Sequence, residues 1–108
     1  MHNLAAYVRD KLNHLDKEGI TITDYARRRA TLRQIDLSEM YLHLLNPNSL
    51  RWAERQHVRG EERFNCYFSH SNRRAIRIII VFDDYDVTVI NVIKLKRQWQ
   101  QHLKQRNL

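Results

Sequence analysis

Two runs of β-branched residues, separated by a short acidic segment, constrain this chain more than any other feature. The runs extend from Arg73 to Phe82 and from Val87 to Lys96, and Asp83-Asp84-Tyr85-Asp86 lies between them. Side chains branched at Cβ favour extended backbone, and two such runs joined by a short polar segment are typical of a β-hairpin. Both runs are apolar at most positions, which is typical of strands in the middle of a sheet with a covered face. The sequence therefore predicts a central hairpin over residues 73–96.

A further strand is predicted over residues 62–70, where apolar and polar side chains alternate. The apolar alternation, with the even-numbered positions of the first β-branched run, would face a layer of helices. These positions are Phe64, Cys66, Phe68, Ile76, Ile78, Ile80 and Phe82. A weaker strand pattern begins at Leu50, and we expect the chain to turn over residues 56–60 and again over 71–73.

Helical periodicity precedes the strands. Apolar residues at helical spacing predict three helices, at about residues 3–17, 24–33 and 36–46. Thr21 or Thr23 is placed to cap the second of them. Apolar residues one helical turn apart return over residues 97–107, which predicts a C-terminal helix.

This order of elements predicts an α+β fold, because helices segregated from a run of strands form a separate layer. We expect N-terminal helices packed on a three- to four-stranded antiparallel meander sheet, followed by the C-terminal helix. At 108 residues the chain is one domain. It divides into an N-terminal helix (1–19), a core (20–96) and a C-terminal helical tail (97–108).

The charge of the chain favours an acidic partner. Lys and Arg number 19 against 12 Asp and Glu, which gives a formal net charge of +7. Nucleic acid is the first candidate and an acidic protein the second, and a solvated basic surface is the alternative. The chain has no signal-peptide pattern and no apolar run long enough to span a membrane, so we expect a cytoplasmic protein without a membrane partner.

The single cysteine, Cys66, cannot form an intramolecular disulfide and lies in a strand pattern. We interpret it as a small buried hydrophobe, with a catalytic thiol as the alternative. The six histidines are scattered, and no Cys pair or His/Cys cluster has the spacing of metal ligands. The sequence therefore predicts no metal and no cofactor.

The polar alternation of the sheet is the candidate functional surface. With a regular register, one face would carry Arg63, Asn65, Tyr67, Arg77, Ile79, Thr88, Lys94 and Lys96. Cations neutralise phosphates, and a tyrosine ring stacks on an unpaired base. If the substrate's own 2′-hydroxyl attacks the phosphate, the protein must supply an acid, a base and a cationic clamp. The candidate catalytic set is then Arg63, Tyr67, His70, Arg77 and Lys94. A sheet face that is polar because it meets water is the alternative.

Other cations are candidates for contacts with nucleic-acid phosphates. They lie in the second helix, in the predicted turns and at the end of the last strand: Arg27, Arg28, Arg59, Arg73, Arg74 and Lys96. A run such as Arg27-Arg28-Arg29 is more often a solvated helix face than a phosphate-binding one.

Several short motifs follow one another in an order that is typical of a known family. They are Ile22–Arg29, Arg33–Glu39, Leu45-Asn46-Pro47, Arg59–Arg63 and Val87–Lys94. In this order they resemble the domain of unknown function 4258 family, which is itself similar to the RelE/ParE-like toxin superfamily. The resemblance covers about residues 20–96, and Tyr25-Ala26 stands where the family pattern has His-Ala.

The resemblance implies a RelE-like sheet packed on two helices, a toxin-like ribonuclease role and an antitoxin-type protein partner. Two hypotheses follow. The first is a metal-independent endoribonuclease that acts on RNA, and the second is a non-catalytic module that binds nucleic acid or a protein through its basic sheet face. Tyr25 in place of the family's histidine favours the second hypothesis. A homodimer formed through the helical termini is compatible with both.

Overall fold

A computed structural model describes residues 3–69, 74–84 and 86–95 of the chain. The elements in chain order, with η for a 3-10 helix, are α1 (Ala5–Leu12), η1 (Lys17–Gly19), β1 (Ile20–Ile22), α2 (Asp24–Leu32), α3 (Leu37–Leu45), η2 (Pro47–Ser49), β2 (Leu50–Val58), β3 (Glu61–Ser69), β4 (Ala75–Asp83) and β5 (Asp86–Leu95). The predicted C-terminal helix, over residues 97–108, lies outside the described residues.

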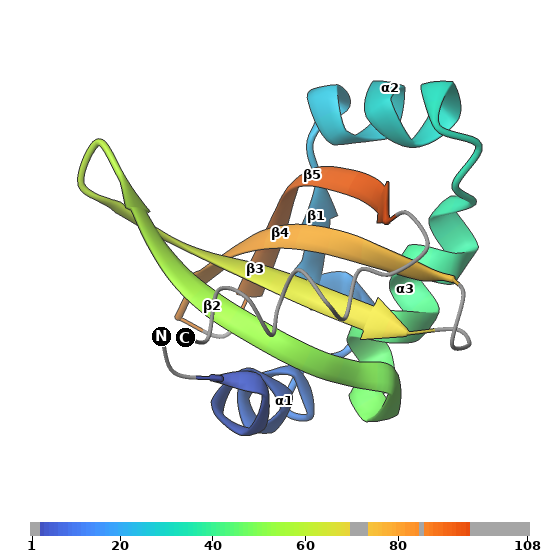
Figure 1. Cartoon of the computed structure of the whole chain (residues 1–108). Coiled ribbons are helices and arrows are strands. Elements are labelled where there is room, and N and C mark those ends of the chain that lie inside the picture. Colours follow the sequence, from blue (N-terminus) through green and yellow to red (C-terminus); the bar gives the residue numbers. More distant parts are fainter. Residues whose placement is uncertain (1–2, 70–73, 85, 96–108) are drawn as a thin grey trace.

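Five strands form one mixed sheet in the order β1-β5-β4-β3-β2 (Figure 1). Strands β2 to β5 pair antiparallel with their neighbours, whereas β1 pairs parallel with β5. The described part of the chain therefore confirms the α+β class. The expectation of a purely antiparallel sheet of three or four strands is wrong, because the short β-branched segment Ile20–Ile22 adds a parallel edge strand beside Val87–Val89.

The helices pack on one face of this sheet. α1 lies along β2, α2 lies beside β5 (Figure 1), and the His43 ring of α3 is 5.0 Å from the ring of Phe68 on β3. The even-numbered residues of β3 and β4 face this layer and form a core with the apolar residues of the helices, as the alternation predicted. No described helix is long and apolar enough to cross a membrane. No described helix covers the opposite side of the sheet, which we call the open face.

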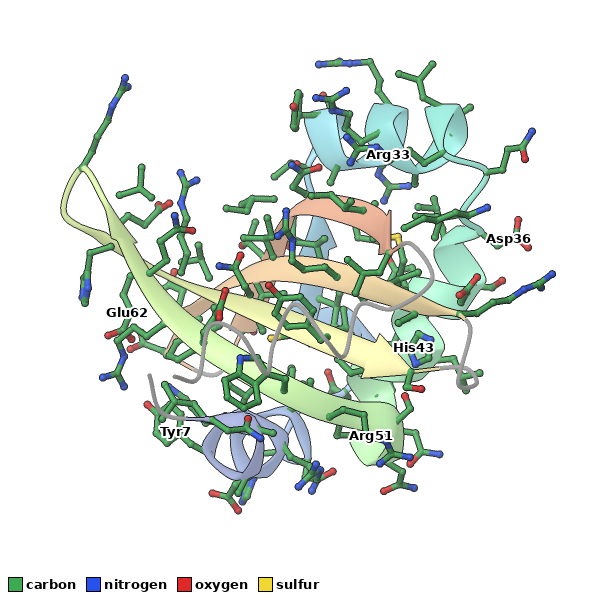
Figure 2. The ribbon with its side chains drawn as sticks, in the orientation of Figure 1. Tyr7, Arg33, Asp36, His43, Arg51 and Glu62 are labelled. Atoms are coloured by element: carbon green, nitrogen blue, oxygen red, sulfur yellow. The ribbon has the colours of Figure 1, made fainter. Side chains whose placement is uncertain are left out.

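Side chains next to the ends of two helices form hydrogen bonds with backbone groups near both edges of the sheet. The Asn3 side chain accepts a bond from the Ala53 N–H at 3.1 Å and donates to the Arg51 carbonyl at 3.2 Å, which covers part of the outer edge of β2. On the other side, the Arg33 guanidinium beneath α2 donates to the Val92 carbonyl of β5 (Figure 2). A sheet edge with unpaired backbone is prone to pairing with other chains, so these contacts limit where a partner strand can add.

A β-bulge divides β5 into two halves. Ile80 pairs with Val89 while Ile79 pairs with Asn91, so Ile90 is an extra residue without a partner on β4. The extra residue reverses the alternation. Val87 and Val89 are buried in the core before the bulge, and Val92 is buried there after it.

Two local predictions need correction. The first helix ends at Leu12 and not near residue 17, because Asp16 uses its side chain to accept a bond from the Gly19 N–H in a separate 3-10 turn. The turn predicted over residues 56–60 is shorter in the structure and consists of Arg59 and Gly60. Both residues have positive φ, 52° and 81°, as a two-residue hairpin turn requires. Strand β2 therefore runs on to Val58.

Thr23 is the N-cap of α2, since its side-chain oxygen accepts a bond from the Ala26 N–H at 3.0 Å. We expect Thr23→Ala to lower the free energy of unfolding by about 1 kcal/mol, because the helix loses a partner for one of its first N–H groups. Denaturant unfolding followed by circular dichroism measures this. Thr31→Ala, on the exposed side of the same helix, is the matched control and should change stability by less than about 0.5 kcal/mol. Equal effects of the two substitutions would contradict the capping role.

Candidate functional site

A buried carboxylate is the centre of a polar cluster on the open face. Glu54 of β2 is only 4% exposed. The Tyr67 hydroxyl of β3 donates to its Oε1 at 3.2 Å, and the Trp52 indole N–H donates to its Oε2 at 3.3 Å. Trp52 and Tyr67 are paired across the two strands. A buried charge needs such hydrogen bonds to offset its lost hydration, so the register of β2 on β3 fixes the carboxylate in place.

Arg77 adds a cation beside this cluster. It is paired with Tyr67 in the β3–β4 register, and its guanidinium carbon lies 6.0 Å from the centre of the Tyr67 ring. Among the buried side-chain polar atoms of the described residues, Nε of Arg77 lacks a hydrogen-bond partner. A buried donor without an acceptor costs about 1–3 kcal/mol. The N–H of Arg77 is therefore a buried donor without an acceptor beside the Glu54 and Tyr67 side chains.

The remaining neighbours on this face are already engaged. Arg63 donates from Nε to Glu61 Oε1 at 2.9 Å, on the same strand and near the tip of the β2–β3 hairpin. Asn65 is 8% exposed and donates to Gln56 Oε1 at 3.3 Å. Arg63 is thus held in a partly exposed ion pair, away from the buried centre of the cluster.

Lys94 lies on the other side of the sheet. It pairs with Ile76, whose side chain belongs to the helix-facing core, whereas Ile93 pairs with Arg77. The expectation that Lys94 shares a face with Arg77 is therefore wrong, and the cause is the bulge at Ile90, which shifts every later side chain of β5 by one position. Thr88 precedes the bulge and pairs with Val81, so it stays on the open face.

Of the predicted catalytic residues, the structure thus brings Tyr67 and Arg77 together and leaves Arg63 at the margin of the same face. His70 lies outside the described residues. Glu54 and Trp52 were missed as site residues. The available signal was a glutamate two positions after a tryptophan in a strand pattern, which puts both on one face.

The predicted phosphate-binding cations are spread over the molecule. Arg27 and Arg28 are exposed on α2, whereas Arg59 is exposed at the tip of the β2–β3 hairpin, well away from α2 (Figure 1). Arg74 is exposed just before β4. Arg73 and Lys96 lie outside the described residues.

Tyr25 is 45% exposed on α2. Its hydroxyl accepts a hydrogen bond from Nε of Arg29 at 2.9 Å, and the guanidinium carbon lies 5.2 Å from the ring centre. The two side chains are one helical turn apart, so they form a local surface pair.

Cys66 is fully buried in the core, and burial raises the pKa of its thiol far above the ordinary value because a thiolate would lose its hydration. Its Sγ–H faces the Phe64 carbonyl at 3.8 Å. The thiol is a packing group, as the strand pattern predicted, and not a nucleophile. Within residues 3–69, 74–84 and 86–95, no three His, Cys, Asp or Glu side chains gather as metal ligands would.

Comparison of the chain with protein-family models, with curated proteins and with solved structures found no match.

The bond from Tyr67 to Glu54 can be tested by stability. We expect Tyr67→Phe to lower the free energy of unfolding by about 1–2 kcal/mol, because a buried carboxylate oxygen loses a donor. Tyr41→Phe is the matched control, since no hydrogen bond of the Tyr41 hydroxyl is present among the described residues. It should change stability by less than about 0.5 kcal/mol. Chemical denaturation of both variants would measure the difference, and equal losses would refute the special role of the Tyr67 hydroxyl.

Proposed function

We propose that this protein is a metal-independent endoribonuclease of the RelE/ParE-like toxin type, which acts on RNA at the open face of its sheet. The observation that supports this most is the buried cluster of Glu54, Tyr67 and Arg77, which combines a proton acceptor, a proton donor and a cation with a free N–H. These are the groups that cleavage by a neighbouring 2′-hydroxyl requires.

The reaction assigns one role to each group. Glu54 takes the proton of the 2′-hydroxyl as the new bond from the 2′-oxygen to phosphorus forms. Arg77 stabilises the extra negative charge of the five-coordinate phosphate through its guanidinium N–H groups. As the bond from phosphorus to the 5′-oxygen breaks, the Tyr67 hydroxyl protonates the leaving oxygen. The products are a 2′,3′-cyclic phosphate and a 5′-hydroxyl.

The resemblance of residues 20–96 to the domain of unknown function 4258 family supports the same proposal, through that family's similarity to RelE/ParE-like toxins. The layer of described helices is compatible with it, because none of these helices covers the polar side of the sheet. A protein of this type would be neutralised by an antitoxin-type partner, and an acidic one suits a chain of net charge +7.

Removal of the Arg77 guanidinium tests the proposal. We expect purified wild-type protein to cleave single-stranded RNA in the presence of EDTA, and Arg77→Ala to be slower by about 100-fold, because the transition state loses its charge-stabilising donor. Arg51→Ala, a matched loss of an exposed arginine near the start of β2 (Figure 2), should retain the wild-type rate. Loss of cleavage in EDTA, or equal rates for the two variants, would overturn the proposal.

A second candidate function is RNA binding without cleavage. It is favoured by the burial of Tyr67 and Glu54, each 4% exposed and hydrogen-bonded to the other, while Arg27 and Arg28 are exposed on α2. Arginines on a helix surface contact phosphates without reading sequence.

A salt titration distinguishes this second function. If α2 binds the RNA backbone, Arg28→Ala should reduce the slope of log K against log salt concentration by about 0.7, because one phosphate contact is lost. Arg28→Lys keeps the charge and is the matched control. An unchanged slope in Arg28→Ala would exclude this helix from the interface, and RNA cleavage by the wild type would exclude the non-catalytic function.

A further inference from the structure

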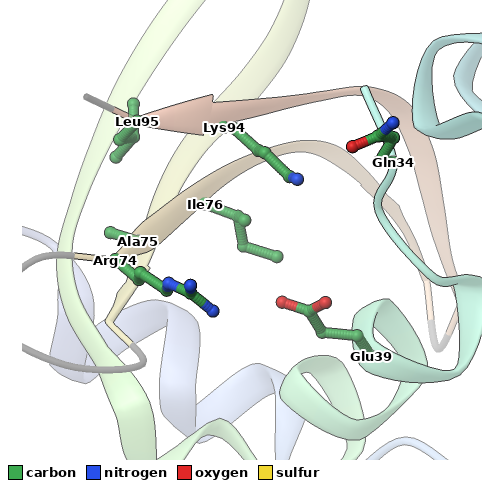
Figure 3. A pocket seen from close by; sticks show the side chains of 7 residues that line it. All are labelled: Gln34, Glu39, Arg74, Ala75, Ile76, Lys94 and Leu95. Atoms are coloured by element: carbon green, nitrogen blue, oxygen red, sulfur yellow. The ribbon is translucent and has the colours of Figure 1, made fainter. Parts of the chain in front are cut away.

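A cavity of about 710 Å³ opens at the end of the sheet where β4 begins and β5 ends. Its polar lining comes from three parts of the chain: Gln34 in the α2–α3 connection, Glu39 on α3, and Arg74 and Lys94 on the sheet side (Figure 3). Ile76 contributes an apolar wall. The volume is within the usual range for small-molecule sites, about 300–1,000 Å³.

Two cations reach this cavity from neighbouring strands. Lys94 is there because the bulge in β5 turns it to the helix side, opposite Ile76. Its ammonium group points toward the α2–α3 side of the cavity (Figure 3), and it has no hydrogen bond or ion pair within the described part of the chain. The Arg74 guanidinium points into the same space. Their combined charge suits a phosphate, which Lys binds as a point charge and Arg binds through paired N–H groups.

The opposite wall offers a carboxylate and an amide. The Glu39 carboxylate points into the cavity from α3, with its Oε1 3.9 Å from Nε2 of the buried His43. The Gln34 side chain has no hydrogen-bond partner among the described residues, and it faces Lys94. The backbone of Gln34 has φ of 57°, a left-handed conformation that is uncommon outside glycine and that directs this amide to the cavity rim.

We propose that this cavity binds a guanine nucleotide unit, with the phosphate at Arg74 and Lys94 and the base at Glu39. A carboxylate has only acceptors. Guanine presents two adjacent donors on its Watson–Crick edge, N1–H and the N2 amino group, so it can bond to both carboxylate oxygens. Adenine and cytosine place a ring acceptor beside their amino group, which repels the second oxygen. Single-stranded RNA is read on these edges.

The choice of a nucleotide rests on the proposed action on RNA, and the geometry links the two sites. Ala75 and Leu95 line the cavity, and the same two residues pack with Tyr67 and Trp52 in the apolar cluster of the open face. A strand of RNA with its scissile phosphate at Arg77 would therefore have a path to the cavity for a neighbouring nucleotide. The cavity would then select RNA by the base near the cleavage point.

Titration calorimetry of the wild-type protein with 5′-GMP, 5′-AMP and inorganic phosphate tests this proposal. We expect GMP to bind about tenfold more tightly than AMP, the discrimination typical of one bidentate contact to a base. Phosphate alone should bind more weakly than either nucleotide. Equal affinities for GMP and AMP, phosphate as tight as GMP, or no saturable binding of GMP would each overturn the proposal.

Two variants assign the contacts. Glu39→Gln should abolish the preference for GMP over AMP. Lys94→Ala should lower the affinity for both nucleotides by about tenfold and leave the ratio of the two affinities unchanged, because it removes a phosphate contact. Glu18→Gln and Lys17→Ala, matched changes at exposed positions outside the cavity, should leave both affinities unchanged. Preference for GMP that survives in Glu39→Gln would refute the role of the carboxylate.

The same measurements separate this inference from the proposed nuclease activity. Arg77→Ala should bind GMP as the wild type does, since Arg77 is on the open face and does not line the cavity. GMP-selective binding without RNA cleavage would overturn only the nuclease proposal. RNA cleavage by a protein that does not distinguish GMP from AMP would overturn only the guanine site.

Discussion

The register between β4 and β5 is the constraint on which both candidate sites depend. A regular alternation along β5 would continue from Val87 and Val89 to Asn91, and would turn an amide into the core. The extra residue Ile90 avoids this cost, because it brings Val92 inward and leaves Asn91 outside, where its Oδ1 accepts a bond from the Val92 N–H at 2.9 Å. A buried unpaired amide would cost about 1–3 kcal/mol, so the bulge has a clear energetic reason. Its consequence is that Lys94 reaches the cavity and not the open face.

The one-sided helix layer follows from how the sheet edges are satisfied. At β2, the backbone of Ala53 bonds to two residues that precede α1. Its N–H donates to Asn3 Oδ1, and its carbonyl accepts a bond from the Leu4 N–H at 2.8 Å. At β5, two parts of the chain bond to the outer backbone groups. Strand β1 pairs with the first residues of β5, and the Arg33 side chain donates to the Val92 carbonyl farther along the strand. The helices enter from the edges and then pack inward on the same side. No described helix covers the other side of the sheet, which carries Glu54, Tyr67 and Arg77.

Much of this arrangement was predictable from local patterns. The alternation in residues 62–69 and the β-branched runs correctly placed the core residues, because period-2 burial is a local property. The parallel strand β1 was not predictable in the same way, since three residues carry little pattern and their pairing with Val87–Val89 is set by the packing of the whole domain. The two-residue turn at Arg59-Gly60 has a non-glycine residue at positive φ, which gives only a weak signal. The prediction of the sheet face for Lys94 was wrong for a third reason. One unpaired residue in a strand reverses the face on which every later side chain lies.

The burial of Glu54 and Tyr67 strengthens the electrostatic interactions of these groups and also limits access to them. In a site with little water, a carboxylate held by two donors and a guanidinium with a free N–H act on a phosphate more strongly than they would at an exposed surface. Under the proposed function, RNA would have to reach groups that are only 4% exposed, so the face would have to become accessible before it could act. The exposed arginines of α2 need no such change to meet a phosphate backbone. If the protein acts on RNA as proposed, binding at the exposed cations and chemistry at the buried cluster would be separate events on separate surfaces, and a defect in one need not appear in the other.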